Sequence, residues 1–272
     1  MLRFKQVLTH TLSPLQMAAG RNRRINHAIT QARDAIFTAG RTDTEECGIA
    51  DLDYESAFDL LSLEWVKLVL KKKGLSEKAL ERFTNIYKEG ITIPMVNNKL
   101  GKKIENRRMS LRQGDRPSGS WFCFGIDPLL TFLSKFLKGI TVYTHPVQGP
   151  VPEDSSGTLP PIETKYSVLG YLDDIKPAIT NMMEFCLVDE ASHLFENASG
   201  CRLHRSAETD KCKFLALSKW RTTLQQQDIP LSYLKLSNHL DFFGVTLFSS
   251  YVTTGRRNEE ILTEKIKSQI NS

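Results

Sequence analysis

The chain has 272 residues, of which 40% are hydrophobic, so it can bury the core of one large domain or of two small ones. A formal charge of +5 favours a polyanionic partner without requiring one. The five cysteines are dispersed along the chain and do not suggest a disulfide framework, so we expect reduced thiols in an intracellular protein. Because no signal peptide or membrane-spanning segment is evident, we expect a cytoplasmic or nuclear protein that does not use a membrane.

Hydrophobic periodicity and turn residues predict alternating strands and helices in the first half of the chain. After a helical start, residues 48–53 are expected to form a buried strand, and residues 56–73 the helix that follows it. Ser76 should cap a second helix, which is followed by a β-hairpin over residues 91–107.

The second half predicts more helices and strands around one exposed segment. Residues 144–161 are rich in Pro, Gly, Ser and Glu, so they should form a flexible loop that is poorly ordered without a partner. Alternating elements that include a hairpin indicate an α+β fold, in which helices cover one face of an antiparallel sheet. The other predicted elements are a strongly apolar helix at 119–137 ended by Gly139, a strand at 166–169, a helix at 179–195 capped by Gly200, and strands at 212–217 and 240–248.

Two adjacent carboxylates, Asp173 and Asp174, follow the strand at 166–169. Alternation along a strand would point them to opposite faces, so a tight turn is needed to bring both to one site. Like charges at short range resist joint ionisation, and a divalent cation such as Mg²⁺ removes that conflict. A third carboxylate from another strand would complete a two-metal site, and Asp53, at the end of the first strand, is the candidate.

Three motifs resemble those of the reverse transcriptases of non-LTR (LINE-type) retrotransposons. The first is the run Asp53-Tyr54-Glu55-Ser56-Ala57-Phe58-Asp59, at the end of the first predicted strand. The second is the turn Arg112-Gln113-Gly114-Asp115-Arg116-Pro117-Ser118, in front of the long apolar helix. The third is the doublet with its preceding residues, Tyr171-Leu172-Asp173-Asp174. They occur in the order that the family shows.

The resemblance extends toward both ends of the chain. Residues 16–21 are similar to the family's fingers segment, and residues 199–204 leading to Lys211 are similar to the segment that follows its palm helix. Residues 242–245 are similar to its primer-side hairpin. It implies partial helical fingers at 1–47, a polymerase palm at 48–250, and the start of a thumb at 251–272.

By this resemblance the chain would be an RNA-directed DNA polymerase that acts on an RNA template, a DNA primer and deoxynucleoside triphosphates. Asp53, Asp173 and Asp174 would hold two Mg²⁺ ions, with Mn²⁺ as a possible substitute, and the carbonyl of Tyr54 would add an oxygen ligand. Phe58 would exclude ribonucleotides. Gln113 and Gly114 would lie beside the incoming nucleotide, and Lys211 would protonate the leaving pyrophosphate.

Each of these assignments has a plainer alternative. Phe58 also fits helix core, Lys211 a solvated lysine, and residues 113–114 an ordinary turn. The basic runs 21–24 and 71–73, with Lys102, Lys103, Arg107 and Arg108, fit either phosphate contacts or solvated faces. A zinc site from His193, Cys201, His204 and Cys212 is a further reading, although their spacing matches no standard finger. The whole chain is also compatible with an inactive nucleic-acid-binding remnant of a retrotransposon.

Overall fold

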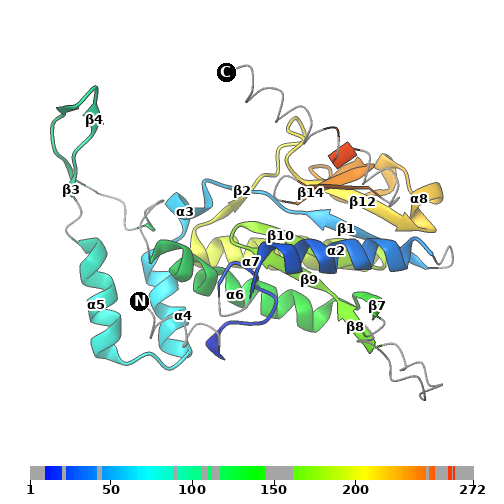
Figure 1. The fold of residues 1–272 in the computed structure, drawn as a ribbon, viewed down its shortest axis with the longest axis horizontal. Helices are drawn as coiled ribbons and strands as arrows, with labels where there is room; N and C mark the ends of the chain where they lie inside the picture. Colours follow the sequence, from blue (N-terminus) through cyan, green and yellow to red (C-terminus); the bar gives the residue numbers. More distant parts are fainter. Residues whose placement is uncertain are drawn as a thin grey trace, which may run out of the picture.

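A five-stranded sheet is the centre of the fold in the computed structural model, which describes residues 10–19, 23–41, 45–88, 91–105, 110–111, 117–144, 162–242, 245–248, 257–258 and 260. Its strand order is β13-β12-β1-β10-β9, and only the β12–β13 pair is parallel (Figure 1). The strands are β1 (Glu46–Asp51), β9 (Val168–Tyr171), β10 (Asp174–Ile179), β12 (Lys213–Ser218) and β13 (Lys235–Ser237).

The central strand β1 contributes to two hydrophobic cores, because successive side chains of a strand point to opposite faces. Ile49 lies in one core together with its cross-strand partners Ala178 and Leu215, and Ala50 lies in the other with its partner Phe214. All of these positions are apolar, which explains why β1 can be buried on both faces.

Two helices, α6 (Ser118–Phe136) and α7 (Met182–Ser199), cover the face of the sheet that carries Ala50, and α4 (Leu63–Lys72) packs against both of them. Asn181 caps α7 by accepting a hydrogen bond from the N–H of Glu184 at 3.1 Å, and Gly200 ends the helix with a φ of +81°. The helix and its glycine cap agree with the prediction, except that α7 begins at Met182 and Ile179 is the last residue of β10.

The opposite face is covered by α2 (Ile25–Ala39), whose small residues Ala28, Ala32 and Ala35 are fully buried there. Their spacing of three and four residues places them on one helix face, so the helix approaches the sheet closely. Helices therefore lie on both faces, and the prediction of helices on one face was wrong. Two hairpins contribute to the same core: β7 (Ile140–Thr144) with β8 (Ile162–Tyr166), and β14 (His239–Phe242) with β15 (Val245–Phe248).

Two predicted elements are interrupted. The helix expected at 56–73 is split into α3 (Ala57–Leu60) and α4, because Leu61 is extended and the N–H of Ser62 bonds to the carbonyl of Ser199 at 2.8 Å. The single strand expected at 240–248 is the β14–β15 hairpin. The predicted second helix is α5 (Glu77–Lys88), and the predicted hairpin is the projecting one in Figure 1, formed by β3 (Ile91–Thr92), β4 (Met95–Val96), β5 (Lys99–Leu100) and β6 (Ile104–Glu105). The strands β7, β10 and β13 were not predicted.

Short elements complete the described fold. The strand β2 (Tyr54–Glu55) pairs with β11 (Arg202–Leu203), and α8 (Trp220–Thr223) is followed by the 3₁₀ turn η1 (Gln226–Asp228). Residues 145–161 of the predicted loop lie outside the described residues, as do most of residues 251–272. Within the described part, no helix is both long enough and apolar enough to span a bilayer.

All five cysteines are free thiols. Cys47, Cys123, Cys201 and Cys212 are buried, and burial raises the pKa of each of these thiols to about 12. Cys186 is exposed on α7.

Candidate active site

The end of β1 fixes the position of Asp53. The preceding residue, Leu52, still bridges to Ile175 of β10, with its N–H 2.9 Å from the Ile175 carbonyl oxygen. The N–H of Asp53 then lies 3.4 Å from Cys212 Sγ, and its carbonyl accepts the N–H of His204 at 3.0 Å. The backbone is therefore anchored on both sides, while the Asp53 side chain stays 41% exposed.

The β9–β10 hairpin brings Asp173 to the same end of the sheet. Tyr171 and Asp174 pair across the hairpin, so Leu172 and Asp173 are its two turn residues. Burial raises the pKa of the Asp173 carboxyl, and the negative charge of Asp53 raises it further. These two carboxylates, distant in the sequence, are thus close enough in space to influence each other.

The third predicted ligand, Asp174, is engaged in a buried ion pair. Its Oδ1 lies 2.5 Å from Nζ of Lys176, and the same ammonium donates to Oδ1 of Asp51 at 2.5 Å. The Lys176 side chain is only 2% exposed, and its Nζ also lies 4.5 Å from the centre of the Phe242 ring. Burial raises the pKa of Asp174 to about 7 against the attraction of Lys176, and the charge of Asp51 adds to the rise.

Sequence reasoning missed this trio of Asp51, Asp174 and Lys176, although a signal was present. Residues two apart on a strand share a face, so Asp51 accompanies Asp53 and Lys176 accompanies Asp174. A lysine within the otherwise apolar run of β10 requires a buried carboxylate partner, since a lone buried ammonium is strongly disfavoured.

Basic groups surround the carboxylate of Asp53. Nε2 of His204 lies 3.4 Å from Asp53 Oδ2, and its Nδ1 lies 3.5 Å from Oε1 of Glu55. The Nζ of Lys211 is 4.0 Å from the same Asp53 oxygen, and its side chain is 59% exposed. The structure therefore brings Lys211 beside Asp53, and it adds His204, which the sequence had suggested as a zinc ligand.

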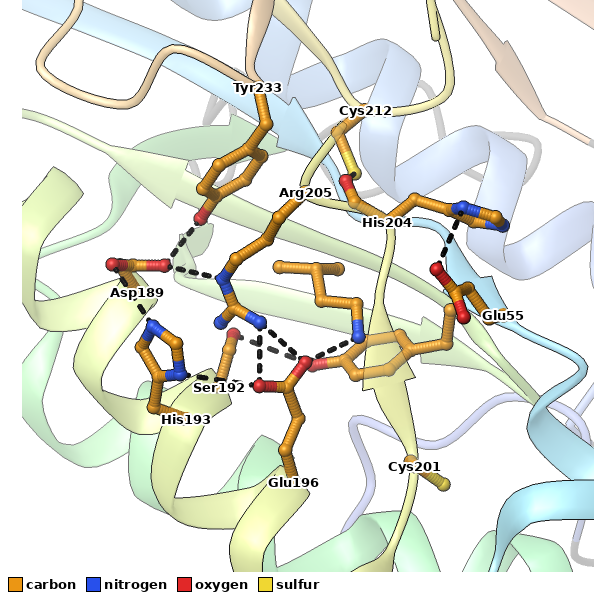
Figure 2. A network of polar contacts seen from close by, with 12 residues as sticks. Glu55, Asp189, Ser192, His193, Glu196, Cys201, His204, Arg205, Cys212 and Tyr233 are labelled. Carbon is orange, nitrogen blue, oxygen red and sulfur yellow. Dashed lines mark hydrogen bonds and ion pairs between the residues drawn. The ribbon is translucent and has the colours of Figure 1, made fainter. Parts of the chain in front are cut away.

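A polar network holds the 201–212 segment against α7 (Figure 2). Arg205 contacts both oxygens of Glu196 at 2.5 Å and Asp189 Oδ1 at 3.2 Å. The hydroxyl of Tyr233 donates to Asp189 at 2.8 Å, and His193 also lies beside Asp189 and Glu196. This network supports the loop that carries His204.

The predicted zinc residues do not converge. Cys212 Sγ contacts the carbonyl of His204 at 3.4 Å, whereas Cys201 Sγ faces the carbonyl of Ala57 at 3.8 Å. In the part of the chain that the structure describes, no three His, Cys, Asp or Glu side chains form a group suited to a metal. The same finding means that Asp174 does not join Asp53 and Asp173 as a third ligand in this arrangement.

The pair of Asp53 and Asp173 nevertheless fits Mg²⁺, because this ion usually takes one or two carboxylates and completes its shell with water and substrate phosphates. Burial, and to a smaller extent the charge of Asp53, raises the pKa of Asp173, and a cation bound between the two carboxylates would favour the ionised form.

The other predicted site residues show mainly packing contacts. The Tyr54 side chain is buried, with its hydroxyl 3.4 Å from Ser192 Oγ, and burial raises its pKa. The half-buried Phe58 stacks on Phe122, with ring centres 4.5 Å apart. Gln113 and Gly114 lie outside the described residues.

Three of the basic residues suggested as phosphate contacts are engaged within the protein, among them Lys71, which pairs with Glu77 at 2.6 Å. Arg23 donates to the carbonyls of Leu12, Ser13 and Gln16, and Lys73 pairs with the buried Asp127. Lys102 and Lys103 are exposed beside the projecting hairpin.

The sequence matches no model of a known protein family and no curated protein sequence. The structure is similar to solved telomerases. Apo telomerase from Candida tropicalis, truncated from its C-terminal domain, aligns with a TM-score of 0.52 and 11% identity, covering 91% of this chain and 43% of that chain. Telomerase from Candida albicans in complex with the TWJ fragment of telomeric RNA gives 0.51 and 12%, covering 91% and 36%. The corresponding Candida tropicalis complex gives 0.51 and 11%, covering 83% and 32%.

This chain therefore spans less than half of the length of these telomerase chains. At such low identity the likeness concerns the fold alone, a mixed α+β architecture that resembles part of these telomerase chains.

Proposed function

We propose that this chain is the polymerase region of a reverse transcriptase from a non-LTR retrotransposon, which extends a DNA primer on an RNA template. One observation carries the proposal: Asp53 and Asp173 lie at one end of a sheet with a reverse-transcriptase-like fold, close enough for the charge of Asp53 to raise the pKa of Asp173. The motif runs that contain both residues support the same activity.

In the proposed reaction, the primer 3′-hydroxyl attacks the α-phosphorus of a deoxynucleoside triphosphate and pyrophosphate leaves. Two Mg²⁺ ions, replaceable by Mn²⁺, would supply activation of that hydroxyl and neutralisation of the phosphate oxygens. Asp53 and Asp173 would hold them, with Asp174 fixed next to them by Lys176. Lys211 would donate a proton to the leaving pyrophosphate, and the 4.0 Å between its exposed ammonium and Asp53 Oδ2 supports this role.

The test is primer extension on an RNA template with Mg²⁺, deoxynucleotides and the purified chain. We expect extension by the wild type and background levels for Asp53→Asn and Asp173→Asn, because each variant removes a carboxylate from the pair. Glu190→Gln, which neutralises an exposed carboxylate on α7, is the matched control and should extend normally. Mn²⁺ binding followed by electron paramagnetic resonance should weaken in the two aspartate variants only.

An inactive nucleic-acid-binding remnant is the second candidate function, and the engagement of Asp174 by Lys176 favours it because a three-carboxylate metal site does not form among the described residues. That candidate predicts RNA–DNA binding that weakens steeply with salt, without primer extension in any divalent cation. Extension by the wild type that depends on Asp173 would exclude it.

A further inference from the structure

Gln16 is a fully buried polar residue that contacts the turn carrying Asp173. The residue has no exposed surface, and its Oε1 accepts the N–H of Leu172 at 3.2 Å and the N–H of Ala18 at 3.0 Å. Its own segment is bound to β9 as well, since Met17 N–H donates to the Gly170 carbonyl at 2.8 Å and Gly170 N–H donates to the Leu15 carbonyl at 3.0 Å. The segment around Gln16 therefore lies along the strand that leads into the turn.

The chemistry of the amide fixes its orientation. Both groups that face Oε1 are backbone N–H donors, so a flipped amide would place its own N–H groups against two donors. In the orientation observed, Nε2 is buried and has no hydrogen-bond partner among the described residues. An unsatisfied buried donor is unfavourable by about 1–3 kcal/mol, so a role in packing alone would be served better by an apolar side chain.

The turn needs such a contact because of its backbone. Leu172 has a φ of +55°, a left-handed conformation that disfavours a residue with a Cβ by about 1–2 kcal/mol. The first central position of a two-residue hairpin with a positive φ usually carries glycine. Leu172 has a branched apolar side chain instead, and the bond from its N–H to Gln16 stabilises the strained conformation.

We propose that Gln16 is a positioning residue: its amide oxygen holds Leu172 in the left-handed conformation and thereby aims the neighbouring carboxylate of Asp173 at Asp53. The consequence for catalysis depends on the proposed polymerase function, whereas the effect on the turn does not. Gln16 acts only through the backbone of residue 172.

The test compares Gln16→Met, Leu172→Gly and the double variant, with Gln31→Met as the control because Gln31 is an exposed glutamine of α2. In primer extension, kcat should fall about 10- to 100-fold in Gln16→Met, because a small misplacement of a reacting group has an effect of that size. The KM for the deoxynucleotide should change much less. Glycine adopts a positive φ without strain, so Leu172→Gly should restore most of kcat in the double variant.

A second measurement, backbone amide hydrogen exchange by NMR, does not depend on activity. The Leu172 amide should exchange at least about fivefold faster in Gln16→Met, while the Gly170 amide keeps its protection. Loss of protection at both amides would mean that the whole segment detaches, and this result would overturn the proposal. An unchanged kcat, or a fall that Leu172→Gly does not rescue, would also overturn it. If the wild type does not extend primers, the proposed function fails, and exchange at Leu172 alone decides whether Gln16 positions the turn.

Discussion

Replacing Lys176 with methionine should strongly destabilise the protein. The ammonium of Lys176 is buried and lies 2.5 Å from both Asp51 and Asp174, so Lys176→Met leaves two carboxylates facing each other without a counter-ion. Removing one partner of a buried ion pair typically lowers the free energy of unfolding by about 3–5 kcal/mol. Methionine fills a similar volume, so most of the loss should come from charge and not from a cavity.

The loss should depend on pH, and its sign follows from the carboxylate left behind. The pKa of Asp174 is already raised in the folded protein from 3.8 to about 7, so the folded state binds more protons than the unfolded state between these values. This contribution to stability is present at low pH and disappears as pH rises toward 7. Without Lys176 the pKa of Asp174 should rise further, because its nearest positive charge is gone. The variant should therefore be less impaired at pH 5.5 than at pH 8.

Urea denaturation at both pH values measures the effect, with the triple variant Asp51→Asn, Asp174→Asn and Lys176→Met as the control. The triple variant has no buried charge at this place, so it should recover most of the stability at pH 8. A loss below about 1 kcal/mol for Lys176→Met at pH 8, or an equal loss at both pH values, would refute the reasoning about the buried charge.

Three further substitutions test the packing and the polar contacts. Gly48→Ala should lower the free energy of unfolding by about 1–3 kcal/mol or more, because the added Cβ would lie 2.2 Å from Phe214 Cζ and 2.6 Å from the Leu215 carbonyl oxygen. Urea denaturation measures this loss, and an unchanged stability would contradict the prediction. Asn181→Ala removes the cap of α7 and should lower stability by about 1 kcal/mol, measured in the same way, with recovery in Asn181→Ser as the check. Arg205→Met removes the contacts to Glu196, so it should lower the free energy of unfolding by about 2–3 kcal/mol and speed proteolytic cleavage between residues 204 and 212. If cleavage there is as slow as in the wild type, the network does not hold that loop.

The convergence of the two site carboxylates was predictable because it depends on local rules. Asp53 follows the apolar strand β1, and Asp173 lies in the short acidic turn after β9. Both strands are antiparallel to β10, which lies between them, so they run in the same direction and the residues after them reach the same end of the sheet. The C-terminal end of α7 was predictable for a similar reason, because a glycine cap such as Gly200 is recognised from a few neighbouring residues.

Features that depend on distant contacts were not predictable in this way. The break at Leu61 arises from a hydrogen bond between Ser62 and Ser199, which no local pattern reveals. The placement of α2 on the second face follows from a match between its alanines and the sheet surface, and this match exists only after the strands are ordered. The ion pair of Asp51 with Lys176 joins two strands. The alternation of side chains along each strand indicates the face on which each residue lies, but it does not identify the residue of the neighbouring strand with which it pairs.

The distribution of the thiols makes the natural chain ready for site-selective labelling. Four of its five cysteines are buried with pKa values near 12, so a maleimide dye at neutral pH should react with Cys186 alone, without any cysteine being removed. A fluorophore attached there would lie on the exposed side of α7, and its anisotropy would test the proposed binding of an RNA–DNA duplex while every residue of the candidate site keeps its native side chain.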